Sequence, residues 1–145
     1  MARGENLTQI FTVVVSAIIF NDRGEVLLGK RSLTEEIYPG LWGIPGGKIE
    51  ASSSTPDIVE ATLIREAREE MAIEIQPEYY VASSCKISQG EAKLYLLYTA
   101  RWLTGMPQAL EDTEEVGWFS VSELSKLTLT PHTHQHILGA QQKYK

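Results

Sequence analysis

An acidic segment that follows a pair of glycines constrains this chain more than any other feature. Residues 65–70 read Arg-Glu-Ala-Arg-Glu-Glu, and the glycine pair stands at positions 46 and 47, where it predicts a turn. In a helix, Glu66, Glu69 and Glu70 would share one face. Like charges about 5 to 6 Å apart repel by roughly 3 kcal/mol where the effective dielectric constant is about 20. Because a divalent cation would remove that repulsion, the segment predicts a helix with metal-binding carboxylates.

The size and composition of the chain predict one globular domain over residues 1–145. With 43% apolar residues it can bury a core without disulfides or structural metals. The single cysteine, Cys85, excludes an internal disulfide, and we expect it to be a small buried apolar residue. Residues 1–7 lack a secretory signal, and the apolar stretch at 10–20 is too short to span a bilayer. We therefore expect a cytoplasmic protein without a membrane segment.

The charge balance argues against a polymeric nucleic acid as the partner. Thirteen basic and nineteen acidic residues give a net charge of -6, and no Lys/Arg cluster provides a duplex-binding surface. A small ligand that carries phosphate remains compatible with this charge, because a bound metal can offset the negative charge locally.

The order of apolar runs and turn residues predicts alternating strands and helices. Strands are expected at residues 13–20, 25–31, 79–87, 93–102 and 116–120, with a short apolar segment at 41–44 and a hairpin turn at 21–24. Thr55 as the cap and Pro56 at the first position predict that the acidic helix runs from residue 56 to about 71. Its apolar stripe is Leu63, Ile64, Ala67 and Met71. A brief helix at 122–127 and a last helix at 132–142 are expected beyond it.

These residues resemble the Nudix hydrolases, whose signature is Gx5Ex7REUxEExGU with U an aliphatic residue. The core of the signature matches residues 65–70, the diglycine lies upstream, and Ile73 closes the motif. The lead-in at 41–45 and the Val-Gly-Trp-Phe segment at 116–119 extend the resemblance over most of the chain. The resemblance implies an α/β/α sandwich with a mixed central sheet, as in the small single-domain MutT-like members.

The chain departs from that signature at two places. Counting back from Arg65 by the family spacing reaches Asp57 rather than glutamate, and the loop from Gly47 is four residues longer than the pattern. Asp57 either supports the metal site, as the resemblance implies, or only complements the helix dipole in the first turn. Glu50 is a weaker substitute. The closing glycine of the signature is replaced by Ala72, which is less suited to a left-handed helix end.

The resemblance implies a Mg²⁺ site, with Mn²⁺ as an alternative ion. Magnesium takes carboxylate oxygens and bridges to substrate phosphates. The implied metal ligands are the Gly46 carbonyl and the side chains of Glu66, Glu69, Glu70 and Asp57. Arg65 would hydrogen-bond a glutamate and fix its rotamer. Without the resemblance, the same helix face would be interpreted as a solvated charged surface.

Residues outside the helix are candidates for the remaining roles. The general base is Glu66 or Glu69 on the helix, or one of Glu111, Glu114 and Glu115 in the later acidic segment, whose alternative is a solvated loop. Candidate substrate-binding residues are Arg31, Gly47 and Lys48, and the two cations are otherwise surface charges. Candidates for stacking on a base, or else for filling the core, are Trp42, Tyr95, Tyr98 and Trp118. His132 and His136 are one turn apart, but no further zinc ligand accompanies them.

The function expected from the resemblance is Mg²⁺-dependent hydrolysis of a nucleoside triphosphate to the monophosphate and pyrophosphate, which cleanses the nucleotide pool. A nucleotide sugar, a dinucleoside polyphosphate or a dinucleotide cofactor would use the same metal helix. A non-catalytic Nudix-like module that binds nucleotide or protein is the alternative from another class. The expected partner is a small-molecule nucleotide, and the chain is expected to be a monomer or a homodimer.

Overall fold

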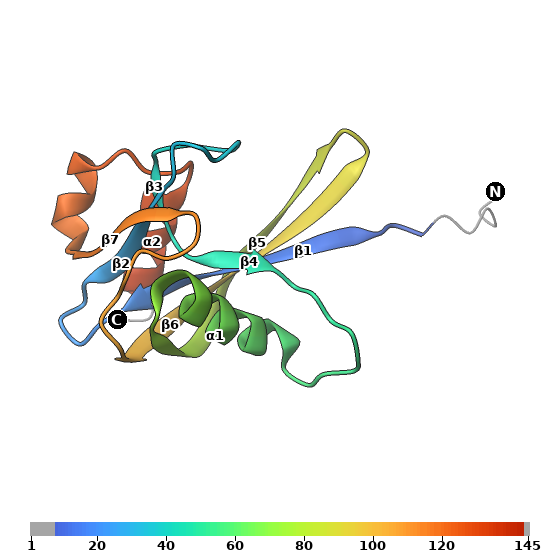
Figure 1. Ribbon diagram of the computed structural model, residues 1–145, viewed down its shortest axis with the longest axis horizontal. Coiled ribbons are helices and arrows are strands. Elements are labelled where there is room, and N and C mark those ends of the chain that lie inside the picture. The colour runs from blue at the N-terminus through green and yellow to red at the C-terminus, as the bar shows by residue number, and fades with distance from the viewer. Residues whose placement is uncertain (1–7, 144–145) are drawn as a thin grey trace.

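A seven-stranded mixed sheet forms the centre of the protein, and the computed structural model describes residues 8–143 (Figure 1). The strands are β1 Phe11–Phe20, β2 Val26–Arg31, β3 Trp42–Gly43, β4 Gly46–Lys48, β5 Glu74–Ser88, β6 Glu91–Thr104 and β7 Thr113–Phe119. The helices are α1 Ile58–Met71, the 3₁₀ helix η2 Val121–Lys126 and α2 Thr133–Lys143. The strand order is β3-β2-β1-β6-β5, while β4 pairs with β1 and β7 with β2. β1 and β6 run parallel and the other pairs antiparallel, so the sheet is mixed.

Strand β1 supplies side chains to both layers of the core because its residues alternate between the two faces of the sheet. Val15, Ala17 and Ile19 are buried in the cluster that contains α1. Ile18 is buried on the other face, in the cluster that includes residues of η2 and α2. Helices therefore cover both faces of the sheet, which confirms the α/β fold with a mixed central sheet (Figure 1).

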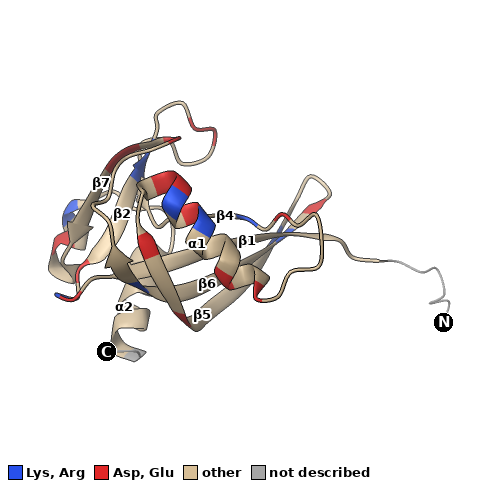
Figure 2. Cartoon of the chain, turned by 60° about the horizontal axis from the view of Figure 1, so that its bottom comes forward, with Lys and Arg blue, Asp and Glu red and all other residues tan. Residues whose placement is uncertain are grey.

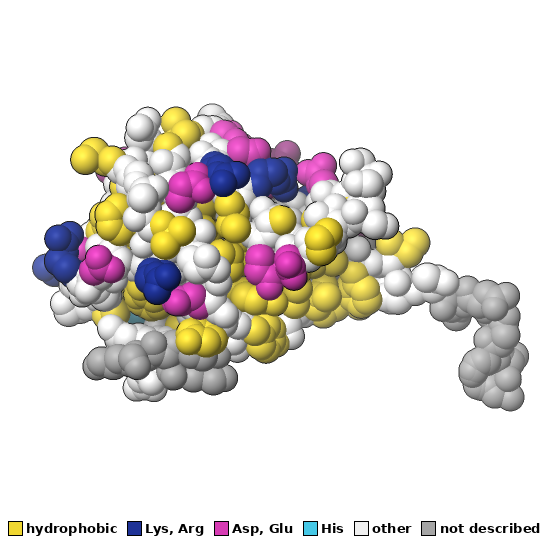
Figure 3. All heavy atoms as spheres, turned by 90° about the horizontal axis from the view of Figure 1, so that it is seen from below, with side chains coloured by type: hydrophobic (Ala, Val, Ile, Leu, Met, Phe, Trp, Pro, Cys, Tyr) yellow, Lys and Arg dark blue, Asp and Glu magenta, His cyan; other side chains and the backbone are white. Residues whose placement is uncertain are grey.

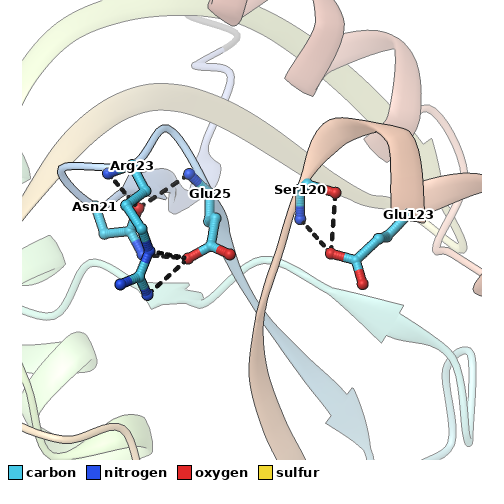
Figure 4. Close-up of polar contacts among 5 residues, drawn as sticks. All are labelled: Asn21, Arg23, Glu25, Ser120 and Glu123. Atoms are coloured by element: carbon cyan, nitrogen blue, oxygen red, sulfur yellow. Dashed lines mark hydrogen bonds and ion pairs between the residues drawn. The ribbon is translucent and has the colours of Figure 1, made fainter.

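Local hydrogen bonds explain two of the chain reversals. In the β1–β2 turn, Asn21 Oδ1 accepts hydrogen bonds from the backbone N–H groups of Arg23 and Glu25, each at 3.0 Å (Figure 4). Before η2, the Glu123 carboxylate accepts the backbone N–H of Ser120 at 2.8 Å, which completes a capping box. The turn residues confirm the predicted hairpin, and the cap explains why a short helix follows β7.

Helix α1 begins two residues later than the sequence predicts. Its N-cap is Asp57 with φ 51°, whereas Thr55 donates its hydroxyl hydrogen bond to the carbonyl of Ser53 at 3.2 Å. The expected cap at Thr55 is therefore wrong, because that hydroxyl is used inside the preceding loop. At the other end, Ala72 adopts the left-handed conformation with φ 59° in the place of the family's glycine. The predicted apolar stripe is confirmed, since its members are buried or pack against the core: Leu63, Ile64, Ala67 and Met71.

Strands β5 and β6 form a long hairpin whose end extends beyond the body of the protein (Figure 1). Its turn is Gln89-Gly90, with φ 53° and 80°. Cys85 lies on this extension and is exposed, so the prediction that it is buried is wrong. The reason is that β5 is an edge strand and its outer half packs only against β6.

The α1 side of the molecule carries apolar side chains at its surface, which form a band beside acidic ones (Figure 3). Phe11 of β1 and Ile87 of β5 are exposed large apolar residues near the end of the hairpin. Both lie in register with Ala92 of β6, the strand that runs between β1 and β5. Within residues 8–143, no helix has the length and apolar character needed to cross a membrane.

Candidate active site

The glycine pair forms part of a strand instead of the turn that the sequence predicts. Gly46 and Gly47 belong to β4 and lie opposite Ser16 and Val15 of β1. A Cβ atom at Gly46 would lie 2.3 Å from the backbone oxygen of Val15. Glycine is thus required because the two strands approach each other more closely there than any side chain permits.

The second glycine leaves room for the carboxylate of Glu66. A Cβ atom at Gly47 would lie 2.4 Å from the carboxylate carbon and one oxygen of Glu66. The Glu66 side chain, which is 17% exposed, therefore rests directly on the backbone of β4. Through this contact, the glycine pair and the acidic helix of the signature lie together in one site.

Glu70, one helical turn after Glu66, is the most perturbed acid described. Its carboxylate accepts the backbone N–H of Gly46 at 3.3 Å. Burial, together with the negative charge of Glu66, raises the pKa of Glu70 to about 8. Burial also raises the pKa of Glu66, and the charges of Glu69, Glu111 and Glu50 act in the same direction. The two half-buried carboxylates therefore form a site at which a cation would be favourable.

Arg65 contacts both neighbouring acids of the motif. Its guanidinium lies 3.3 Å from Glu66 and 3.7 Å from Glu69, and it reaches the carbonyl of Lys48 at 3.5 Å. Glu69 is more exposed than Glu66, at 42% of its side chain. Arg68 faces elsewhere and makes two hydrogen bonds, at 2.6 and 2.8 Å, to Glu74. The alternation of acids and bases along α1 is visible in Figure 2.

Asp57 does not lie beside the other acids. It is nine residues before Glu66, which corresponds to about 13 Å along the helix axis. Its side chain makes no capping hydrogen bond. Glu50, at the start of the long loop after β4, is instead among the charges that raise the pKa of Glu66. The structure thus brings Glu50 closer to the acidic site than Asp57.

The later acidic segment contributes one residue to the site. The backbone N–H of Leu110 donates to the carbonyl of Glu70 at 3.1 Å, which fixes this loop against the end of α1. The next residue, Glu111, has φ 51° and raises the pKa of both Glu66 and Glu70 by its charge. Glu115 instead pairs with Lys30 at 3.5 Å in the β2–β7 ladder. Of the three candidate bases in this segment, Glu111 is placed at the site.

The two predicted phosphate-binding cations differ in their surroundings. Arg31 donates from Nε to the carbonyl of Ile37 at 2.8 Å and lies 3.7 Å from Glu35, so it supports the loop after β2. Its charge also lowers the pKa of Glu70, which places Arg31 within electrostatic range of the site. Lys48 is exposed at the end of β4.

A cleft of about 1080 Å³ is lined by Arg31, Glu66, Glu70 and Glu111, whereas Lys48 does not line it. The carboxylates of Glu66 and Glu70, β4 and the loop after β2 line one part, and the β5–β6 hairpin and the start of α2 line the rest. Among the predicted stacking residues, Tyr95 lines the cleft. The others belong to core contacts: Trp42 packs edge-on against Phe119, Trp118 against Trp102, and Tyr98 against Tyr80.

The predicted histidine pair also lines the cleft. His132 and His136 have ring centroids 6.3 Å apart, and His132 has φ 66°. Across residues 8–143, no group of three His, Cys, Asp or Glu side chains converges as a protein-only metal site would require. The histidine pair therefore gains no third zinc ligand within this range.

Magnesium does not need such a cage. It commonly uses one or two carboxylates, retained waters and substrate phosphates. Glu66 and Glu70 fit this requirement, because both carboxylates are partly withdrawn from water and Glu70 is held against the backbone of β4. Glu69 and the Gly46 carbonyl are the neighbouring oxygen donors proposed for the same ion.

The fold and the acidic helix define a hydrolase of the class that cleaves pyrophosphate bonds. The chain matches the NUDIX domain family over residues 10–139 and belongs to that family. It is a Nudix hydrolase of the small MutT-like type, which acts on pyrophosphate bonds in nucleotide-type small molecules. The predicted family and enzyme class are thus confirmed, and the non-catalytic module is not supported.

Curated relatives show two kinds of activity. The chain is 35% identical over 122 residues to a CTP pyrophosphohydrolase of Escherichia coli, which covers 81% of this chain and 82% of the relative. It is 33% identical over 117 residues to an NAD-capped RNA hydrolase of Stutzerimonas stutzeri, which covers 77% of this chain. The match spans only 38% of that second protein.

Solved structures show the same fold. A MutT NUDIX hydrolase from Burkholderia pseudomallei superposes with a TM-score of 0.73 at 29% identity, covering 90% of this chain and 98% of that chain. A MutT protein from Methanosarcina mazei superposes with a TM-score of 0.75 at 22% identity, covering 97% of this chain and 100% of that chain.

Proposed function

We propose that this Nudix hydrolase converts a nucleoside triphosphate into the monophosphate and pyrophosphate with Mg²⁺. The observation that carries this proposal is the pair of desolvated carboxylates, Glu66 and Glu70, beside the glycine strand in a cleft of about 1080 Å³. A divalent cation bound there would compensate the charge of the acids and could coordinate the pyrophosphate of the substrate, and the cleft has room for the nucleoside. The likeness to a CTP pyrophosphohydrolase over most of both chains supports this substrate class.

A bound magnesium ion would neutralise charge on the phosphate oxygens and on the leaving group. Glu66, Glu69, Glu70 and the Gly46 carbonyl would hold it, and Mn²⁺ would serve as a substitute. Arg65 keeps Glu66 and Glu69 oriented through its contacts at 3.3 and 3.7 Å. The backbone of Gly47, the charge of Arg31 and the exposed Lys48 ammonium are the proposed contacts to substrate phosphates.

Glu111 is the proposed general base. It lies near Glu66 and Glu70 but belongs to a different element, so it can accept a proton from the attacking water while those two acids are occupied by cation binding. Its loop is fixed to α1 by the Leu110 hydrogen bond. Glu66 and Glu69 remain the alternatives, and their substitution would also weaken metal binding.

The test is a substrate panel with separate detection of pyrophosphate and orthophosphate. The panel contains the eight common nucleoside and deoxynucleoside triphosphates, a nucleotide sugar, a dinucleoside tetraphosphate and NAD. Magnesium-dependent release of pyrophosphate from a triphosphate supports the proposal, and its loss in Glu69→Gln and Glu70→Gln assigns it to this site. Hydrolysis restricted to the nucleotide sugar, dinucleoside tetraphosphate or NAD would replace the triphosphate with that substrate class. Tight binding of nucleotide without turnover would contradict hydrolysis.

A further inference from the structure

Two lysines of the β5–β6 hairpin face each other across the ladder. Lys86 of β5 lies directly opposite Lys93 of β6. Like charges directly opposite each other in an antiparallel pair destabilise the sheet. The sequence pattern does not reveal this pair, because the two lysines are seven residues apart and the register of the hairpin brings them together.

Both lysines point into the active-site cleft. Residues that lie in register on neighbouring strands share a face of the sheet, and Lys86 shares its face with Ser84 and Ser88 at spacings of two. All three line the cleft, as does Lys93. The intervening Cys85 lies in register with Leu94 and belongs to the opposite face. This wall of the cleft therefore offers two ammonium groups and two hydroxyl groups, all hydrogen-bond donors.

One acid partly balances this positive charge. Glu91 lies 3.8 Å from the Lys93 ammonium and accepts a hydrogen bond from Thr12 at 3.4 Å. Among residues 8–143, no carboxylate lies within ion-pair distance of Lys86. The wall therefore keeps a net positive charge, while the carboxylates of Glu66 and Glu70 make the other part of the cleft acidic.

The sheet register gives the separation between the two parts. Gly47 lies opposite Val15, and Lys93 lies opposite Thr12, three residues earlier on β1. Three residues correspond to about 10 Å along the strand, and the two strand spacings from β4 to β6 add about 10 Å across the sheet. The Cα atoms of Gly47 and Lys93 are thus about 14 Å apart, a gap that a nucleoside unit and a lysine side chain bridge together.

We propose that Lys86 and Lys93 form an anion subsite that binds a further phosphate group, carried on the nucleoside of the substrate on the side away from the scissile pyrophosphate. This inference rests on the proposed function, because it assumes that the pyrophosphate occupies the acidic part of the cleft. The substrate class it defines is a nucleoside 5′-polyphosphate with a second phosphate on its sugar. Such a substrate is oriented by metal-held phosphates at one end and by the lysine pair at the other.

The experiment measures binding without turnover. Each of the four nucleoside 5′-monophosphates is compared by calorimetry, at low salt with Mg²⁺, with its 3′,5′-bisphosphate. The wild-type chain is expected to bind the bisphosphates about five- to tenfold more tightly, and this preference should shrink in 0.5 M NaCl. The double variant Lys86→Met, Lys93→Met should lose the preference while its affinity for the monophosphates is unchanged.

Lys126→Met is the matched control, because Lys126 lies in η2 and does not line the cleft. It should keep the full preference. The melting temperature of the double variant should equal or exceed that of the wild type, since two like charges are removed from one ladder position. Equal affinity of the wild type for both ligands, binding of neither, or a preference that survives in the double variant would overturn the subsite. If the preference is present but no nucleotide is hydrolysed, the subsite stands and the proposed activity fails.

Discussion

The carboxylate of Glu66 occupies the space that a side chain at position 47 would need, with a separation of only 2.4 Å from an added Cβ atom. Two parts of the signature that are nineteen residues apart in sequence are therefore one structural unit. The glycine at this position provides the surface on which the proposed metal-binding acid rests, and the position tolerates no larger residue without displacing that acid.

Substitution Gly47→Ala should reduce kcat/KM about 100-fold, because even a 1 Å displacement of a catalytic group has an effect of this size. The loss of thermal stability should be small in comparison with the loss of activity, since the Glu66 side chain can rotate away from the new methyl group. Gly139→Ala is the matched control, because a Cβ atom there meets nothing within 4 Å. Wild-type activity in Gly47→Ala would show that Glu66 is not required in its present position.

The raised pKa of Glu70 makes the stability of the metal-free protein depend on pH. Its ordinary pKa is 4.5 and its folded-state pKa is about 8, so the folded protein holds a proton that the unfolded chain releases. Stability from this group is fully present below pH 4.5 and is lost as the pH rises through 8. In EDTA, the melting temperature should fall between pH 5.5 and 8.5, by about 3 °C for each kcal/mol lost.

Glu70→Gln removes this titration and should flatten the dependence of the melting temperature on pH. Glu114→Gln, which removes an exposed acid of β7, should not flatten it. Added Mg²⁺ should restore stability chiefly at the alkaline end, because the ion replaces the proton. A profile of Glu70→Gln with the same slope as that of the wild type would show that another group titrates.

The elements of this fold were predictable because their signals are local. Apolar periodicity gives β1, β2 and the stripe of α1, and turn residues give the first hairpin. The outer part of β5 shows where such signals fail. Cys85 has a residue type that is usually buried, but the edge position of its strand depends on which strands pair, and that is decided by contacts distant in sequence.

The site was predictable in part for the same reason. Glu66, Glu69 and Glu70 lie on one helix, so their spacing is sufficient to group them. Glu111 joins them only because its loop is hydrogen-bonded to the end of α1, and spacing alone could not select it over Glu114 or Glu115. Similarly, counting back from Arg65 by the spacing of the signature points to Asp57 as the further acid of the metal site. The long loop after β4 instead places Glu50 nearer to Glu66.

Arg65 and Arg68 provide a matched pair for testing the positioning of the acids. Arg65 contacts Glu66 and Glu69, whereas Arg68 bonds only to Glu74 on the exposed side of the helix. Arg65→Lys should lower kcat about 10- to 100-fold, as is usual for residues that orient metal ligands. Arg68→Lys should leave kcat within about twofold of the wild type, because exposed ion pairs contribute little. Equal losses in both variants would indicate a general effect of charge on the helix.

The general base can be identified by measuring turnover and Mg²⁺ affinity in the same variants. Glu111→Gln should lower kcat about 10²- to 10⁴-fold, while Mg²⁺ affinity stays near that of the wild type. Glu66→Gln should lower both activity and Mg²⁺ affinity. If Glu111→Gln retains a kcat near that of the wild type, the proton acceptor is one of the acids on α1.

The long loop after β4 allows a test of which acid replaces the missing glutamate of the signature. Asp57 caps α1 about 13 Å before Glu66 along the helix axis, whereas the charge of Glu50 already acts on Glu66. Glu50→Gln should therefore weaken Mn²⁺ binding, measured by electron paramagnetic resonance, by about threefold or more, as expected for the loss of one nearby charge. Asp57→Asn should leave Mn²⁺ affinity unchanged. The reverse order of effects would mean that the loop rearranges on metal binding and carries Asp57 to the acidic site.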